Sequence, residues 1–272
     1  MNFRSIVRNV ESLPPLSDTT LIVRELYLNG AGDVDINKLI HTIESDALLT
    51  ANILKMINSP LYGFSKQISS VSQAVTLFGT HIIYGLVVRF SIESSIIANL
   101  RPYGVSNSTF NKICHMQSAL MHQWYSEVDL KHAQILSPLA LIMESGKLVV
   151  SQEVAQNASI KEFLKGIKET PFISEYENEV FGTSSYYVSG LLFEHWNLDT
   201  FYVDMLKGLD FEHDAGSKLG YYIDTLDVVR TAVNVKDIFT KESVLEAAEI
   251  VEDMKLNVDH FIKVATQLKS VN

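Results

Sequence analysis

The feature that most constrains the fold is an apolar repeat of three and four residues, which recurs along the chain. Ile36, Leu39, Ile40 and Ile43 lie at i, i+3, i+4 and i+7. This spacing places them on one face of a helix. Strand-like alternation of apolar and polar residues is nowhere sustained in the sequence. The pattern therefore predicts an all-α fold in which each helix buries one stripe.

Capping residues, prolines and glycines set the boundaries of the predicted helices. These helices cover residues 17–28, 33–43, 45–57, 71–78, 80–96, 108–125, 132–150, 159–167, 174–181, 184–195, 200–206, 217–233, 242–253 and 258–268. The segment Asn99–Gly104 contains Pro102 and interrupts the helical pattern. We therefore expect two packed helical bundles, formed by residues 1–105 and 106–272.

The cysteine count and the apolar segments indicate a cytoplasmic protein. Cys114 is the single cysteine, so an internal disulfide and a Cys-rich zinc module are both excluded. Charged residues interrupt the N-terminal segment, which has no secretory apolar region. The longest uncharged stretch, Gln67–Val88, contains many polar residues. We therefore expect a buried core segment there and no insertion into a membrane.

The negative charge is confined to the second half of the chain. Residues 1–136 hold 10 basic and 10 acidic residues, whereas residues 137–272 hold 12 and 22, which gives the net charge of −10. No basic stripe is present to neutralise phosphates, so direct nucleic-acid binding is not expected. The acidic surplus is typical of a solvated surface, and a docking face for a basic partner is the alternative.

Acidic residues and 8 histidines are compatible with a metal-dependent hydrolase. The common catalytic motifs are missing, however: the sequence has no Gly-rich phosphate loop, G-x-S-x-G, C-x-x-C or H-E-x-x-H. Cys114 and His115 are adjacent on a predicted helix and point about 100° apart, which argues against a nucleophile and its base. His115 and His122 lie seven residues apart on one face, a loose arrangement for metal ligands.

The string Asn58-Ser59-Pro60-Leu61-Tyr62-Gly63 is the most unusual local sequence. A helix end followed by a turn explains these residue types, with Tyr62 packed on the bundle. A turn-held polar surface that recognises a partner is the alternative, through Asn58, Ser59 and Tyr62.

Several motifs resemble the HDOD domain, a relative of the HD phosphohydrolase superfamily. They are LPPL, S-D-A-L-L-T, N-S-P-L-Y-G and I-S-S-V-S-Q-A-V-T-L-F-G, all within residues 13–79. Weaker likeness continues to about residue 235. There, Leu141-Ile142-Met143-Glu144-Ser145-Gly146-Lys147-Leu148 is similar to the family's L-L-H-D-I-G-K-L helix. The resemblance implies that the C-terminal bundle is HD-domain-like.

The resemblance also implies a metal site, from which this chain departs. HD enzymes bind metal through a His-Asp pair, and Met143 and Glu144 stand at those two positions. A later family histidine is matched by Ser185, and a double histidine by Leu209-Asp210.

His115 matches the first ligand of the superfamily and Asp227 the last. A thioether and a hydroxyl are poor replacements for imidazole on a hydrolytic metal. We interpret the site as non-catalytic, with no metal and no cofactor.

Two hypotheses follow. In the first, the chain is a cytoplasmic bacterial signal-transduction protein, a non-catalytic binding or scaffolding module for a partner protein or a small nucleotide. Its candidate surfaces are Asn58, Ser59 and Tyr62, and the pocket around His115, Met143, Glu144 and Asp227. In the second, it is a divergent HD-type phosphohydrolase that acts on a nucleotide through His115, Glu144, Asp227 and His122.

Overall fold

The structure is a computed structural model that describes residues 2–27, 33–63, 66–211, 214 and 217–271. Its α-helices are α1 (Phe3–Glu11), α2 (Asp18–Leu26), α3 (Ile36–Glu44), α4 (Ala47–Ile57), α5 (Val71–Ser95), α6 (Asn107–Tyr125), α7 (Leu130–Ile142), α8 (Gly146–Asn157), α9 (Ile160–Glu169), α10 (Ile173–Phe181), α11 (Ser185–His195), α12 (Thr200–Gly208), α13 (Lys218–Ala232), α14 (Lys241–Asp253) and α15 (Val258–Ser270). No strand is assigned in this described part of the chain. The all-α prediction is confirmed.

Some predicted helix starts coincide with a side-chain cap, and others lie within two residues of one. Ser17, Asp46, Ser106 and Thr240 each accept a hydrogen bond from a backbone N–H of the first turn. Such caps satisfy donors that have no partner inside the helix. The end predicted at residue 28 for the helix after Ser17 lies outside the described residues.

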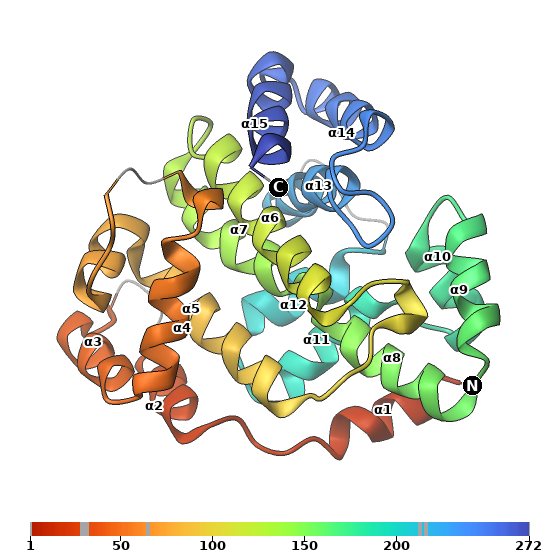
Figure 1. The fold of residues 1–272 in the computed structure, drawn as a ribbon, viewed down its shortest axis with the longest axis horizontal. Helices are drawn as coiled ribbons and strands as arrows, with labels where there is room; N and C mark the ends of the chain where they lie inside the picture. The colour runs from red at the N-terminus through yellow and green to blue at the C-terminus, as the bar shows by residue number, and fades with distance from the viewer. Residues whose placement is uncertain (1, 28–32, 64–65, 212–213, 215–216, 272) are drawn as a thin grey trace.

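Two helices meet at Gly79, as the sequence predicts. The backbone of Gly79 has φ 80° and ψ 166°, inside the segment labelled α5. A side chain on that residue would be strained, so only glycine fits readily. The chain therefore changes direction between residues 71–78 and 80–95 (Figure 1).

The centre of the fold is the pair α6 and α7. α5 packs on α7, α15 packs on α6, and α8 contacts α11, which in turn contacts α12. Figure 1 shows α2 to α4 on one side of this centre and α9 and α10 on the other. The two-bundle division at residue 105 stays a prediction.

The N-terminal helix α1 was not among the predicted helices. It lies against α8 and α11. Ser5 Oγ donates to Glu153 Oε1 at 2.7 Å, and Asn9 Nδ2 donates to Glu153 Oε2 at 2.9 Å. The first residues of the chain are thus held against its second half.

Two segments are apolar and long enough to cross a membrane on length and composition alone. They are Val71–Ser95 and Leu130–Asn157, and 67% and 89% of their most apolar windows are buried inside the fold. Core packing accounts for their composition.

The helix predicted over residues 132–150 is wrong in one respect, because it is interrupted. Met143–Ser145 forms a 3-10 turn between α7 and α8. Ser189 of α11 explains the break: its hydroxyl donates to Met143 O at 2.7 Å and accepts from Gly146 N at 2.7 Å. A side chain from another helix thus satisfies two backbone groups, and the turn presents Glu144 to the interior.

Candidate functional site

Glu144 is the centre of a buried polar network. Its side chain is fully buried, and so is that of Lys147, one turn along the chain. Lys147 Nζ lies 2.6 Å from Glu144 Oε2 and donates to Ser185 Oγ at 2.9 Å. Gln117 Nε2 and Tyr186 OH donate to Glu144 Oε1 at 2.9 and 3.1 Å. A buried ion pair of this kind requires such additional hydrogen bonds.

A second ion cluster is centred on Arg230 of α13. Arg230 Nε lies 2.6 Å from Asp227 Oδ1, and Nη1 donates to Asp210 Oδ1 at 2.8 Å. Nη2 donates to Leu209 O at 2.7 Å. All three nitrogens of the guanidinium are therefore engaged within the protein.

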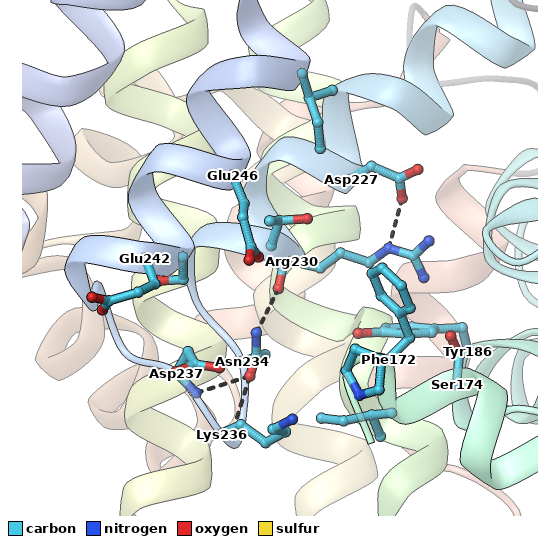
Figure 2. Close-up of a pocket in the computed structure, with 15 residues that line it drawn as sticks. Phe172, Ser174, Tyr186, Asp227, Arg230, Asn234, Lys236, Asp237, Glu242 and Glu246 are labelled. Carbon is cyan, nitrogen blue, oxygen red and sulfur yellow. Dashed lines mark hydrogen bonds and ion pairs between the residues drawn. The ribbon is translucent and has the colours of Figure 1, made fainter. Parts of the chain in front are cut away.

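Tyr186 joins the two clusters. Its ring centroid lies 4.4 Å from Lys147 Nζ and 4.7 Å from Arg230 Cζ. Both distances are within the range of a cation–π interaction. Figure 2 shows Tyr186 and Arg230 side by side at one end of a cavity. The tyrosine is thus a shared contact of two internal cations.

The charges of both clusters are set by burial and by their neighbours. Burial opposes the charged forms of Lys147 and Arg230, but the facing carboxylates, Glu144 for Lys147 and Asp227 for Arg230, outweigh it and raise both pKa values. Burial raises the pKa of Asp227 to about 6 despite the nearby Arg230. Both cations therefore remain charged at neutral pH.

A further buried carboxylate, Glu177, is hydrogen-bonded to the backbone of Ser185. Glu177 Oε2 accepts from Ser185 N at 2.6 Å, and Oε1 accepts from Tyr103 OH at 2.5 Å. Burial raises the pKa of Glu177, and Lys147 acts in the opposite direction. The network thus extends from α6 through α8 and α11 to α10.

These residues do not fit the metal site of HD enzymes. Glu144 and Ser185 match ligand positions of that superfamily, and the ammonium of Lys147 lies within hydrogen-bond distance of both. Asp210 and Asp227 match later positions, and the guanidinium of Arg230 bridges them. Protein cations occupy the space between these positions. In the described part of the chain, no three His, Cys, Asp or Glu side chains come together to hold a metal ion.

His115 lies apart from this network. Burial, together with the Arg89 cation, lowers the pKa of His115 to about 4. Arg89 is itself bound to Glu93 and Asn111. From helix α6, it is Gln117 rather than His115 that donates to Glu144. The structure thus pairs Glu144 with Lys147 and Asp227 with Arg230, the two cations that contact Tyr186, whereas His115 lies near Arg89.

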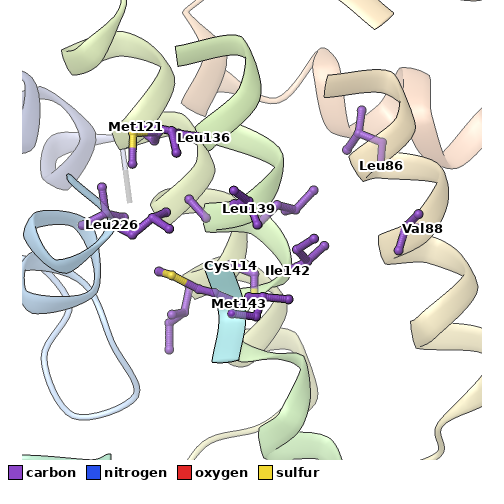
Figure 3. Packing of buried hydrophobic residues seen from close by; sticks show 14 of the residues in the cluster. Leu86, Val88, Cys114, Met121, Leu136, Leu139, Ile142, Met143 and Leu226 are labelled. Carbon is purple, nitrogen blue, oxygen red and sulfur yellow. The ribbon is translucent and has the colours of Figure 1, made fainter. Parts of the chain in front are cut away.

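Met143 and Cys114 belong to the apolar core. Both side chains are fully buried, and Figure 3 shows them in the same part of the hydrophobic cluster. Burial raises the pKa of the Cys114 thiol to about 12. The thiol is therefore neutral at ordinary pH, and Met143 contributes apolar packing.

The Asn58 motif is used inside the fold. Asn58 Nδ2 donates to Leu54 O and to Ile68 O at 2.7 and 2.8 Å, and its Oδ1 accepts from Ile68 N at 2.7 Å. Tyr62 is 6% exposed, and its hydroxyl lies 3.3 Å from Ser118 Oγ. Ser59 Oγ is buried and has no hydrogen-bond partner among the described residues. Local structure thus accounts for Asn58 and Tyr62, and recognition of a partner by this motif stays a prediction.

A cavity of about 300 Å³ opens beside the Arg230 cluster. Its wall is formed by the start of α10, by α11, α13 and α14, and by the loop between the last two. The lining residues include Phe172, Tyr186, Asp227, Arg230, Lys236 and Glu246 (Figure 2). Asp227 is thus both a predicted site residue and part of the cavity wall.

The sequence did not point to Gln117, Lys147, Glu177, Tyr186 or Arg230 as residues of the site. Two of them carried a local signal. Lys147 is the lysine of the quoted G-K-L match, and Arg230 follows Asp227 by one helical turn. Gln117 and Tyr186 are placed by the packing of α6 and α11, which no local pattern shows.

Comparisons with known proteins agree with this architecture. The family model of the HDOD domain matches residues 13–209. A virulence factor from Campylobacter jejuni has a similar solved structure, with 25% sequence identity and a TM-score of 0.58, covering 99% of this chain and 98% of that chain.

Two further solved structures share the fold at lower identity. A proposed phosphohydrolase from Shewanella amazonensis is 14% identical, with a TM-score of 0.69, and covers 97% of this chain and 98% of that chain. A proposed signal-transduction protein from Marinobacter aquaeolei is 16% identical, with a TM-score of 0.69, and covers 96% of this chain and 58% of that chain. No curated protein matches the chain.

Proposed function

Since this chain belongs to the HDOD domain family, we propose that it is a non-catalytic binding module in bacterial signal transduction. The observation that carries the proposal is the pair of internal cations. Lys147 bridges Glu144 and Ser185, and Arg230 bridges Asp210 and Asp227, at positions where HD enzymes carry metal ligands.

The chemistry of these cations supports a binding role. Hydrolysis in HD enzymes needs a metal ion to convert bound water into a nucleophilic hydroxide. An ammonium or a guanidinium neutralises carboxylates but cannot activate water in that way. Neither is a Lewis acid that can accept a lone pair from the water oxygen. The three carboxylates, Glu144, Asp210 and Asp227, instead hold Lys147 and Arg230 against Tyr186.

The proposed partner is another protein of a cytoplasmic signalling pathway. Direct binding to nucleic acid and insertion into a membrane form no part of the proposal. A structural relative from Marinobacter aquaeolei is described as a proposed signal-transduction protein, which is compatible with this role.

Metal content and turnover test the proposal. Purified full-length protein, incubated with Mn²⁺ and then desalted, is expected to retain much less than one equivalent of metal. It is also expected to leave bis-p-nitrophenyl phosphate and cyclic dinucleotides intact. Stoichiometric metal together with hydrolysis that Glu144→Gln abolishes would instead identify a divergent phosphohydrolase.

A further inference from the structure

The cavity beside Arg230 has the charge of a site for cations. Its lining contains four acidic residues, Asp227, Asp237, Glu242 and Glu246, and two basic ones, Arg230 and Lys236. Figure 2 shows Asp237, Glu242 and Glu246 on one side of the cavity and Phe172 with Tyr186 on the other. The acidic residues outnumber the basic ones, so the net charge of the cavity lining is negative.

Both basic residues of the cavity are already engaged. Arg230 is bound to Asp227, Asp210 and Leu209 O. Lys236 Nζ donates to the backbone oxygen of Thr170. A phosphate in the cavity would have to compete with these contacts and would also face the carboxylates, so the cavity does not complement an anion.

The negative charge continues along α14 beyond the cavity. Glu242, Glu246, Glu249 and Asp253 follow one another at i, i+4, i+7 and i+11 and form an exposed acidic row on one helix face. No ion pair involves these four side chains among the residues that the structure describes. Like charges at this spacing repel each other.

The end of the acidic row also works against its own helix. A helix C-terminus carries partial negative charge and favours basic side chains there. The last turn of α14 contains none and instead ends in Glu252 and Asp253. Glu242, in the first turn, is favourable for α14, but the stability of the helix does not explain the acidic residues at its C-terminal end.

An exposed apolar residue completes the opposite wall. Phe172, which directly precedes α10, is 61% exposed and lines the cavity beside Pro171. An aromatic ring at this position can cover the aliphatic part of a lysine or arginine side chain, whose charged end then reaches the carboxylates.

We infer that the cavity and the acidic row of α14 form the docking site for a basic segment of the partner protein. One lysine or arginine side chain enters the cavity between Phe172 and Glu246, and further basic residues lie along Glu249 and Asp253. The inference rests on the proposed binding function and names the chemistry of the partner. Half of this site, α13 and α14, lies beyond the residues that the family model matches.

A labelled peptide tests the docking site. A fluorescein-labelled peptide of alternating lysine and alanine is titrated with full-length protein, and its fluorescence anisotropy is followed at low and physiological salt. We expect Glu246→Lys/Glu249→Lys to weaken binding by about tenfold. Glu11→Lys/Glu25→Lys changes the net charge by the same amount on α1 and α2, where both residues are exposed, and is expected to leave binding within about twofold.

Three outcomes would overturn the inference: no binding of the lysine peptide, equal weakening by both variant pairs, or tighter binding of a glutamate–alanine peptide or of GTP. If circular dichroism shows that Glu246→Lys/Glu249→Lys lowers the helix content, glutamine replaces lysine in both variants. Glu246→Gln/Glu249→Gln is then the test and Glu11→Gln/Glu25→Gln the control. Metal content and turnover are measured separately. A negative result with the peptide would therefore contradict the docking site without contradicting the proposed non-catalytic function.

Discussion

At the scale of single residues, Lys147 determines what the site can do. Its ammonium is fully buried. It forms an ion pair with Glu144, donates a hydrogen bond to Ser185 and lies over the ring of Tyr186. Removing one member of a buried ion pair leaves the other charge without compensation. The stability of the fold and the ionic contacts of the site therefore depend on the same side chain.

We expect Lys147→Met to lower the free energy of unfolding by about 3–5 kcal/mol, measured by urea denaturation. The matched control is Lys165→Met, which removes an exposed pair with Glu169 whose atoms are 3.7 Å apart, and should change stability by about 0.5 kcal/mol or less. The double variant Glu144→Gln/Lys147→Met is expected to recover part of the loss. Equal effects of the two single substitutions would contradict the role given to Lys147.

At the scale of elements, the decisive contact is that of α8 with α11. A Cβ atom added to Gly146 would lie 1.9 Å from Ser185 O and 2.7 Å from Ser189 N. Both neighbours are backbone atoms that cannot turn away. The close approach brings Ser185 to Lys147 and lets Ser189 end the helix at Met143.

Gly146→Ala should therefore cost about 3 kcal/mol or more of unfolding free energy, because the two helices must separate. Gly208→Ala is the control: its Cβ would meet only the end of the Ile223 side chain, at 3.0 Å, and a change within about 1 kcal/mol is expected. Thermal and urea unfolding measure both. A Gly146→Ala protein as stable as Gly208→Ala would show that this contact is not tight.

The helices themselves were largely predictable from the sequence, and the site was not. Caps such as Ser17 and Asp46 act on their own first turns, so local sequence reveals them. The break at Met143–Ser145 is caused by Ser189, forty-odd residues later in the chain, and the apolar pattern runs through it unchanged. Likewise, Glu144 and Asp227 were identifiable by resemblance, whereas the cations that face them required the packing of α8, α11 and α13.

At the scale of the whole molecule, partly buried histidines make the fold sensitive to acid. Burial lowers the pKa values of His81, His115 and His122, that of His115 to about 4. The unfolded chain takes up these protons near the ordinary pKa of 6.5, so stability is lost as the pH falls from about 6.5 to about 4. Asp227 acts in the opposite sense, because its pKa is raised to about 6 by burial and its contribution is lost as the pH rises toward that value.

Urea denaturation between about pH 7 and about pH 4.5 checks this balance. His115→Gln should reduce the decrease in unfolding free energy between the two pH values, by at most ~3 kcal/mol. Asp227→Asn should instead gain stability relative to the wild type as the pH rises from about 4 to about 6. The same pH trend for both variants would show that these two groups do not titrate as described.

The buried Cys114 has a practical consequence. Its thiol is enclosed in the core, and burial raises its pKa to about 12, so it is not a thiolate at neutral pH. Since the chain contains no other cysteine, a cysteine introduced in place of Glu246 would be the one readily alkylated sulfur. A maleimide dye or a nitroxide could then be attached at the cavity mouth without first removing the native cysteine, and its signal would report directly whether that opening is covered.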